Sequence, residues 1–221
     1  MYQKKVAVVI LNWNGKHFLE KFLPSVVDFS NDSYYSVWVA DNNSTDESVI
    51  FLKNNYKQIN IIEFEKNYGF ALGYNKALEQ VDAQYFVILN SDVEVTPNWI
   101  SPIIEFMDKN PDVAVVQPKI LAYHNKKMFE YAGAAGGFID NLGYPFCKGR
   151  ILNKLEQDNG QYNQIDNIFW ATGACLFIRK EDFLENKFDA DLFAHMEEID
   201  LCWRLKNKGK KIIYFPNVKV Y

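Results

Sequence analysis

Apolar and mixed segments alternate along the first half of the chain and predict strands and helices in turn. Nearly continuous apolar runs predict buried strands over Val6–Leu11, Val37–Ala40, Ile59–Glu63, Tyr85–Leu89 and Val113–Gln117. The longer mixed segments between them predict helices over Lys16–Asp28, Ser44–Asn54, Phe70–Glu79 and Pro97–Asp108. Because strands that are buried on both faces read as continuous apolar runs, we expect an α/β fold with a mostly parallel central sheet flanked by helices.

The pattern changes after Pro118. Glycines and aromatic residues are mixed over Tyr131–Gly149, which predicts irregular structure or short antiparallel strands. The polar segment Ile151–Gln164 predicts a mobile loop. A strand-like run follows over Ile168–Arg179, and then a helix that contains Glu197–Lys208. We find no internal repeat and no linker, so we expect a single domain.

Composition excludes several classes of protein. The 221 residues are 48% hydrophobic and 24% charged, which is ordinary for a soluble globular chain. The net charge of −4 offers no basic surface for nucleic acid. The three cysteines are widely spaced and lack CxxC pairing, which argues against zinc and disulfides and favours a reducing compartment. With no signal peptide, and a first apolar run too short to span a bilayer, we expect a cytoplasmic protein, compatible with peripheral attachment to the inner face of a membrane.

Polar and acidic residues end the fourth predicted strand. Asn90, Ser91 and Asp92 follow its apolar run directly, and Glu94 comes two residues later. A carboxylate at a strand end must be solvated, paired or bound to a cation, and ligands of open α/β sheets sit at such ends. Asp92 and Glu94 are hard oxygen ligands suited to Mg²⁺ or Mn²⁺ on a diphosphate, although acidic turns without a ligand are also common.

Four polar side chains follow the first two predicted strands, namely Asn12, Asn14, Asp41 and Asn43. Asp41 lies at a strand end where it could hydrogen-bond to a nucleotide base or ribose. Ser44 and Glu47 fit a capping box for the helix that follows. The alternative interpretation of the two asparagines near the first strand is a turn before Gly15.

A glycine-rich segment opens the third predicted helix. Its candidate ligand-binding residues are Asn67, Gly69, Phe70, Ala71 and Asn75. Backbone N–H groups near a helix N-terminus suit a phosphate or a pyrimidine base. The G-x-x-x-G spacing differs from the Rossmann fingerprint, and a glycine pair by itself is more often a turn than a ligand site.

Acidic residues cluster at the start of the last predicted helix. Glu197, Glu198 and Asp200 stand within four positions, and in a helix Glu197, Asp200, Leu201 and Arg204 share one face. Asp200 and Arg204 are spaced for an ion pair. The repulsion among the three acids predicts that at least one titrates abnormally or binds a cation, as a general base does. The alternative is a solvated acidic helix start that the helix dipole favours. His195, just before the cluster, is either an acceptor contact or a surface residue.

Taken in order, these segments and Thr172-Gly173-Ala174 resemble the family 2 inverting glycosyltransferases with the A-type fold, particularly the rhamnosyltransferase-like branch. The resemblance covers nearly the whole chain. It implies a single glycosyltransferase domain, in which residues 1–117 bind the nucleotide sugar and residues 118–221 form a smaller, mixed β region on the acceptor side.

The implied activity is a metal-dependent, inverting transfer of a hexose such as rhamnose from a UDP- or dTDP-linked donor to a saccharide or lipid-linked acceptor in polysaccharide synthesis. The resemblance assigns Asp41, the Asn12 region and residues 67–71 to the donor, and Asp92 to the divalent cation. Glu198 takes the position of the base, with Glu197 just before it. Asp200 and Arg204 would orient the helix or the acceptor.

Three features depart from the family pattern. Asn90 replaces the first aspartate of the usual metal motif, and the base position holds Glu198 instead of aspartate. The chain also ends at Tyr221, near where relatives often supply a further metal-binding histidine and an acceptor-side helix, so we expect a C-terminal segment to be missing. A nucleotidyltransferase is the second hypothesis, but it would need a basic loop after the first strand. A non-catalytic nucleotide- or sugar-binding module is the third, and the clustered acids argue against it.

Overall fold

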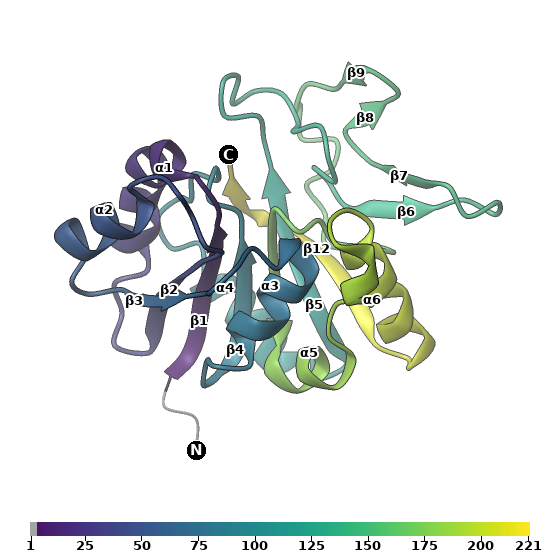
Figure 1. The fold of residues 1–221 in the computed structure, drawn as a ribbon. Helices are drawn as coiled ribbons and strands as arrows, with labels where there is room; N and C mark the ends of the chain where they lie inside the picture. The colour runs from purple at the N-terminus through teal and green to yellow at the C-terminus, as the bar shows by residue number, and fades with distance from the viewer. Residues whose placement is uncertain (1–3) are drawn as a thin grey trace.

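An eight-stranded mixed sheet forms the centre of the molecule (Figure 1), in a computed structural model that describes residues 4–221. Its strands are β1 (Lys4–Asn12), β2 (Tyr35–Asp41), β3 (Asn60–Glu63), β4 (Ala83–Leu89), β5 (Val113–Ile120), β10 (Asp166–Asn167), β11 (Cys175–Arg179) and β12 (Lys211–Val220). Their spatial order is β10-β12-β5-β11-β4-β1-β2-β3. Strands β1 to β4 pair in parallel, as do β5 and β12, whereas β11 and β10 run antiparallel to their neighbours. The mostly parallel sheet expected from the sequence is thus confirmed.

Helices cover both faces of the sheet and create two cores. Helices α1 (Lys16–Phe29), α2 (Ser48–Asn55) and α4 (Ser101–Lys109) pack on one face, and α3 (Gly69–Leu78), α5 (Lys180–Asn186) and α6 (Glu197–Asn207) pack on the other. Strand β1 contributes side chains to both cores. Val8 and Ile10 pack in the first core, and Ala7 and Val9 pack in the second. Within residues 4–221, no helix is both long and apolar enough to cross a membrane.

Two small hairpins project beyond the sheet, at the upper right of Figure 1. One pairs β6 (Gly137–Ile139) with β7 (Pro145–Cys147), and the other pairs β8 (Arg150–Ile151) with β9 (Lys154–Leu155). The first confirms the short antiparallel strands expected in this region. The second occupies part of the expected loop over Ile151–Gln164. The remainder of that loop is anchored to β5 by Lys119, a fully buried side chain whose ammonium lies 2.9 Å from the Asp158 carboxylate.

Three elements begin several residues later in the chain than the sequence predicted. Helix α2 begins at Ser48, because the Asp46 carboxylate accepts the Ser48 backbone N–H at 2.9 Å. The capping box of Ser44 and Glu47 was therefore wrong, and Glu47 instead pairs with Lys16 at 2.7 Å. Helix α4 begins at Ser101 and the strand-like run after Ile168 forms a strand only from Cys175.

Local backbone chemistry explains the last two differences. Asn98 has a left-handed φ of 58°, which a right-handed helix cannot contain. The Thr172 N–H donates to the Gln117 side-chain oxygen at 2.9 Å, so it cannot join a strand ladder. The sequence interpretation also lacked α5, β12 and η1 (Ala190–Leu192), a short 3₁₀ turn.

Candidate functional site

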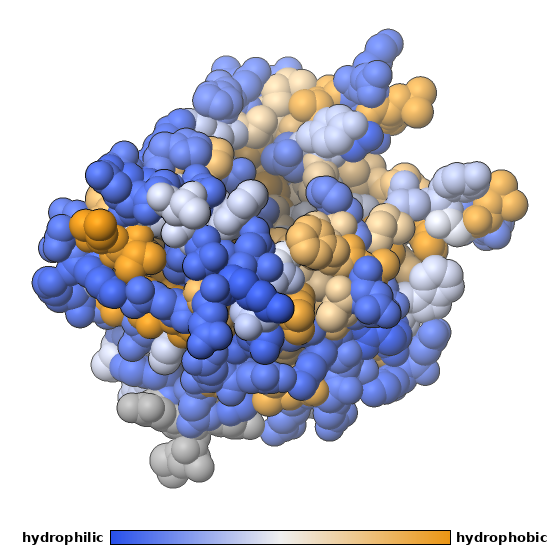
Figure 2. Space-filling view, in the orientation of Figure 1, coloured by the Kyte–Doolittle hydropathy of each residue, from blue (hydrophilic) through white to orange (hydrophobic). Residues whose placement is uncertain are grey.

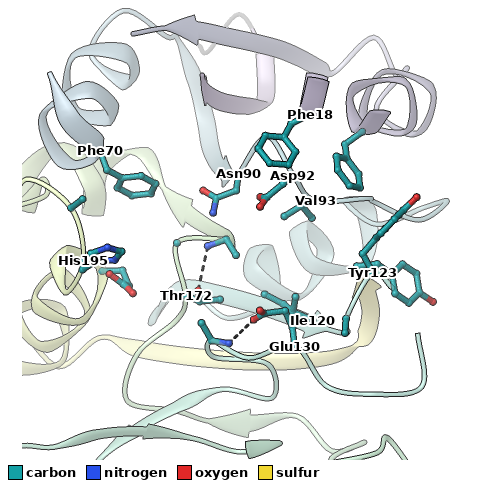
Figure 3. A pocket seen from close by; sticks show the side chains of 18 of the residues that line it. Phe18, Phe70, Asn90, Asp92, Val93, Ile120, Tyr123, Glu130, Thr172 and His195 are labelled. Atoms are coloured by element: carbon teal, nitrogen blue, oxygen red, sulfur yellow. Dashed lines mark hydrogen bonds between the residues drawn. The ribbon is translucent and has the colours of Figure 1, made fainter. Parts of the chain in front are cut away.

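A cleft of about 610 Å³ opens at the carboxyl ends of β4, β5 and β12. This is the edge at which open α/β sheets bind ligands. Asn90 and Asp92 reach it from the end of β4, and Glu197 and Glu198 reach it from the first turn of α6. Figure 3 shows Asn90 and Asp92 across the opening from His195. The cleft therefore joins the predicted metal-ligand segment to the predicted base.

Glu197 is a buried carboxyl and Glu198 a half-buried one, side by side at the start of α6. The backbone enters α6 through Met196, which has a left-handed φ of 73°, and this turn directs both side chains toward the cleft. In each, Oε2 is shielded from solvent and has no hydrogen-bond partner among residues 4–221. Burial raises the pKa of the Glu197 carboxyl. Burial, together with the charge of Glu197, raises the pKa of Glu198 from 4.5 to about 7.

Asp200 and Arg204 hold α6 in place and do not line the cleft. The predicted ion pair is confirmed, with Arg204 Nη2 at 2.7 Å from the Asp200 carboxylate. The same guanidinium donates to the backbone oxygens of Asn186 and Lys187 at 2.5 and 2.7 Å. These carbonyls end α5, so the ion pair fixes the start of α6 relative to that helix. Asp200 is accordingly a positioning residue.

The side chains of Asp92 and Glu94 lie in different surroundings. Asp92 lies exposed in the cleft, where Figure 3 places it between Phe18 and Asn90. The Glu94 backbone instead pairs with Tyr221 through two hydrogen bonds of 2.7 and 2.9 Å, and its carboxylate forms an ion pair with Lys126. Asp92 lines the cleft, whereas Glu94 is not among the residues that line it. The structure thus does not bring together the two expected metal ligands.

The chemistry of Asp92 nevertheless suits a cation that a substrate helps to hold. Residues 4–221 contain no group of three or more His, Cys, Asp or Glu side chains that could cage a metal. Mg²⁺ commonly takes only one or two protein carboxylates and completes its shell with phosphate oxygens and water. A single exposed carboxylate in the cleft therefore fits a diphosphate-bound cation.

Asn90 and Ser91 diverge at the end of β4. Asn90 lines the cleft, and its backbone N–H donates to the Ala174 oxygen at 3.0 Å. The Ser91 hydroxyl instead lies beside Gly15, 3.7 Å from the point where a Cβ on that glycine would stand. Such a Cβ would also lie 2.4 Å from Asn12 Oδ1, so the close approach of these segments requires glycine.

The predicted donor residues after β1 and β2 form a polar network of their own. Asp41 and Asn12 are buried, and the Asp41 carboxylate accepts hydrogen bonds from Asn12 Nδ2 (3.0 Å), the Ser44 hydroxyl (2.6 Å) and the Ser44 N–H (2.8 Å). Asn14 Oδ1 accepts the Thr45 N–H at 2.7 Å. Asn43 is exposed with a left-handed φ of 61°. The structure brings these residues together but leaves them outside the cleft lining.

The N-terminus of α3 is occupied by the chain itself. Phe193 accepts the N–H groups of Phe70 and Ala71 at 2.9 and 3.1 Å, and its ring covers Gly69, which has a φ of 74°. Asn67 Oδ1 accepts the Gly69 N–H and a hydrogen bond from the Asn42 side chain. Of this predicted segment, Phe70 alone lines the cleft.

The Asn75 side chain joins two segments of the fold. Its side-chain amide exchanges two hydrogen bonds, of 2.9 and 3.0 Å, with the backbone of Phe188. These bonds hold the segment that precedes η1 against α3. The amide therefore has its partners within the fold.

Several cleft residues were missed by sequence reasoning. The aromatic side chains of Phe18, Phe22, Tyr123 and Tyr221 line the cleft. His195, which had two interpretations, lines the cleft beside Glu197. Glu130 also lines it and accepts the Ala132 N–H at 2.5 Å (Figure 3). The high aromatic content, 16% of residues, was the only sequence signal for such a wall, and it fits a core equally well.

Comparisons with known proteins agree with this geometry. The sequence model described as "Glycosyl transferase family 2" matches residues 7–185. The N-acetylglucosaminyl-diphospho-decaprenol L-rhamnosyltransferase of Mycobacterium tuberculosis is 24% identical over 96% of this chain and 74% of its own length. Rhamnosyltransferase WbbL of Escherichia coli is 22% identical over 96% of this chain and 80% of its own length.

Solved structures of low sequence identity share the fold. GalNAc-T7, solved with UDP, GalNAc and Mn²⁺, superposes with a TM-score of 0.75 at 16% identity, over 99% of this chain. The mannosyltransferase PcManGT of Pyrobaculum calidifontis, solved with GDP-Man and Mn²⁺, gives 0.70 at 15% identity, over 100% of this chain. The present chain spans 43% of the first structure and 57% of the second. The expected A-type glycosyltransferase fold is confirmed.

Proposed function

The chain belongs to glycosyl transferase family 2, and from this we propose that it transfers a sugar, with inversion and with a divalent cation, from a UDP- or dTDP-linked donor to an acceptor hydroxyl. The observation that carries the proposal is the meeting of Asp92 with Glu197 and Glu198 in one cleft. Two relatives that are named rhamnosyltransferases support rhamnose as the sugar. The diphospho-decaprenol in one of those names supports a lipid-linked saccharide acceptor, met at the cytoplasmic face of a membrane.

Glu198 is the base in this proposal. Its carboxylate accepts the proton of the acceptor hydroxyl while that oxygen attacks the anomeric carbon. The bond from this carbon to the diphosphate breaks on the opposite face, and the nucleoside diphosphate leaves with the bonding electrons. A pKa of about 7 suits a base that must be ionised near neutrality yet bind a proton well. Glu197 assists by raising that pKa.

Asp92 is the cation ligand in this proposal. A bound Mg²⁺ or Mn²⁺ supplies charge neutralisation for the diphosphate. Asn90 and Phe70 line the adjoining wall and orient the donor. Asp41 contacts the base or ribose through the lone pairs that its three hydrogen bonds leave free.

The first test is a calorimetric titration of the protein with UDP and with dTDP, each with Mn²⁺ and then with chelator. We expect one nucleotide to bind only with the metal. Failure of both to bind to folded protein would contradict the donor site.

A Glu198→Gln variant separates catalysis from binding. We expect at least a 100-fold loss of transfer with nearly unchanged donor affinity, since a general base contributes about 10²–10⁴-fold to rate. Parallel loss of both would refute the base assignment. Release of pyrophosphate instead of a nucleoside diphosphate would favour a nucleotidyltransferase, and binding without any turnover would favour a non-catalytic module.

A further inference from the structure

The two projecting hairpins expose large apolar side chains at their tips. Leu142 is 82% exposed between β6 and β7, and Leu152 is 83% exposed between β8 and β9. Tyr144 and Ile151, beside them, are each 68% exposed. Figure 2 shows apolar surface on both projections at the upper right of the molecule. Paired tips of this kind are unusual, because exposed turns normally carry polar residues.

Both tips hold their leucines outward in defined turns. In the first, Asp140 Oδ1 accepts the N–H groups of Leu142 and Tyr144 at 2.8 and 2.9 Å. In the second, Leu152 has a left-handed φ of 51°, a conformation that asparagine or glycine adopts more easily than leucine. The turn therefore keeps an apolar residue where asparagine or glycine would be less strained, and strained positions of this kind occur preferentially at functional sites.

A largely apolar cavity lies beside the second tip and adjoins the catalytic cleft. It measures about 300 Å³ and is lined in part by Leu152, Phe146 and Trp170. Ile199, the residue after Glu198, lines it as well, and Ala132 lines both this cavity and the catalytic cleft. An apolar chain lying in the cavity would thus run between the residue next to the proposed base and the exposed tip at Leu152.

The charge of the hairpins is opposite to that of the whole protein. Residues 137–155 contain Lys148, Arg150 and Lys154 against Asp140, a net charge of +2 in a chain whose net charge is −4. The Lys148 ammonium is paired with the Asp166 carboxylate at 2.5 Å, so Arg150 and Lys154 supply the basic charge beside the tips. The single acid is engaged with backbone N–H groups. Arg150 stacks on the Tyr131 ring at 3.5 Å, which places a cation and an aromatic ring together beside the apolar tips. Basic and aromatic residues that border apolar ones are typical of a surface that meets anionic lipid headgroups.

We propose that the tips at Leu142 and Leu152 insert into an anionic bilayer, so that the 300 Å³ cavity opens on the membrane and admits the lipid part of the acceptor. The lipid acceptor rests on the function proposed above; the docking surface does not. A bilayer fits better than a protein partner, because two separate tips can each enter a fluid layer without a complementary rigid surface.

Vesicle sedimentation tests the docking surface without nucleotide or acceptor. We expect the protein to bind vesicles of phosphatidylethanolamine and phosphatidylglycerol. A Leu142→Ser, Leu152→Ser double variant should bind at least tenfold more weakly. The matched control is Tyr34→Ser with Ile50→Ser, two exposed side chains (66% and 61%) outside the hairpins, and it should bind like the unmodified protein.

A single Leu152→Asn variant distinguishes a loss of vesicle binding from a loss of folding. Asparagine tolerates the left-handed turn, so its unfolding temperature should equal or exceed that of the unmodified protein while its vesicle affinity falls. The proposal is overturned if the unmodified protein does not bind these vesicles, or if the tip variants bind them as well as the control does. Because no nucleotide is present, either result leaves the transferase proposal intact.

Discussion

Replacing Glu198 with glutamine should stabilise the protein, and only at neutral to alkaline pH. The glutamine resembles the protonated carboxyl in shape and charge. In the folded protein, burial and Glu197 raise the pKa of Glu198 to about 7, whereas the unfolded chain keeps the ordinary value of 4.5. Between those two values the folded state retains a proton that the unfolded state has released, so stability falls as pH rises through this window.

The size of the effect follows from the two pKa values. Each pH unit between them corresponds to about 1.4 kcal/mol, so at pH 8 the ionised Glu198 lowers the free energy of unfolding by on the order of 3 kcal/mol. At pH 5 the cost is under about 1 kcal/mol. For a chain of this size, about 1 kcal/mol shifts the unfolding temperature by about 2–4 °C. The Glu198→Gln variant should therefore melt several degrees higher at pH 8 and near the unmodified protein at pH 5.

Urea unfolding at the two pH values measures the difference directly. The control is Glu185→Gln, an exposed carboxyl on α5, for which we expect the same small change at both pH values. An equal effect of Glu198→Gln at pH 5 and pH 8 would refute the inference that burial and Glu197 hold this carboxyl protonated. Loss of stability at pH 8 would refute it as well.

Three further substitutions test other parts of the structure. Asp92→Asn should abolish Mn²⁺-dependent nucleotide binding in calorimetry without changing the unfolding temperature, and retained binding would exclude Asp92 as the cation ligand. Asp158→Ala should leave the Lys119 ammonium buried and lower the free energy of unfolding by about 3–5 kcal/mol in urea; a loss below about 1 kcal/mol would mean that the pair is solvated. Gly69→Ala places a Cβ 2.6 Å from an aromatic ring, whereas Gly143→Ala meets no atom of residues 4–221 within 4 Å, and both have left-handed backbones. Gly69→Ala should therefore destabilise more; equal urea midpoints would show that the ring moves aside.

The sequence predicted best what depends on local pattern. Strand β4 and the polar residues after it were recognisable because a buried parallel strand is a continuous apolar run that ends where the chain meets solvent. The ion pair of Asp200 and Arg204 followed from helical spacing alone. Such features need no knowledge of the rest of the fold.

Features that depend on partners far away in the sequence were not predicted. Strand β12 contains Pro216, which argues against a central strand, but the pairing with β5 shifts register between Phe215 and Lys219 and so accommodates it. The side-chain partners of Glu94 and Asn75, Lys126 and Phe188, lie 32 and 113 residues away in sequence and could not be predicted from local pattern. A polar residue's availability depends on contacts that one-dimensional spacing does not reveal.

The charges of the cleft bear on how a diphosphate could enter it. Its lining carries four carboxyl groups, from Asp92, Glu130, Glu197 and Glu198, the last two with raised pKa values, against one ammonium from Lys21. The first N–H groups of α3, the expected anion-binding site, already donate to the Phe193 carbonyl. A diphosphate that entered this cleft alone would therefore meet like charge and few free donors. A divalent cation on Asp92 changes that balance, because it supplies positive charge at the end of β4, where the acidic lining would otherwise repel the donor. The charges of the cleft lining thus support the metal dependence proposed above without reference to any relative.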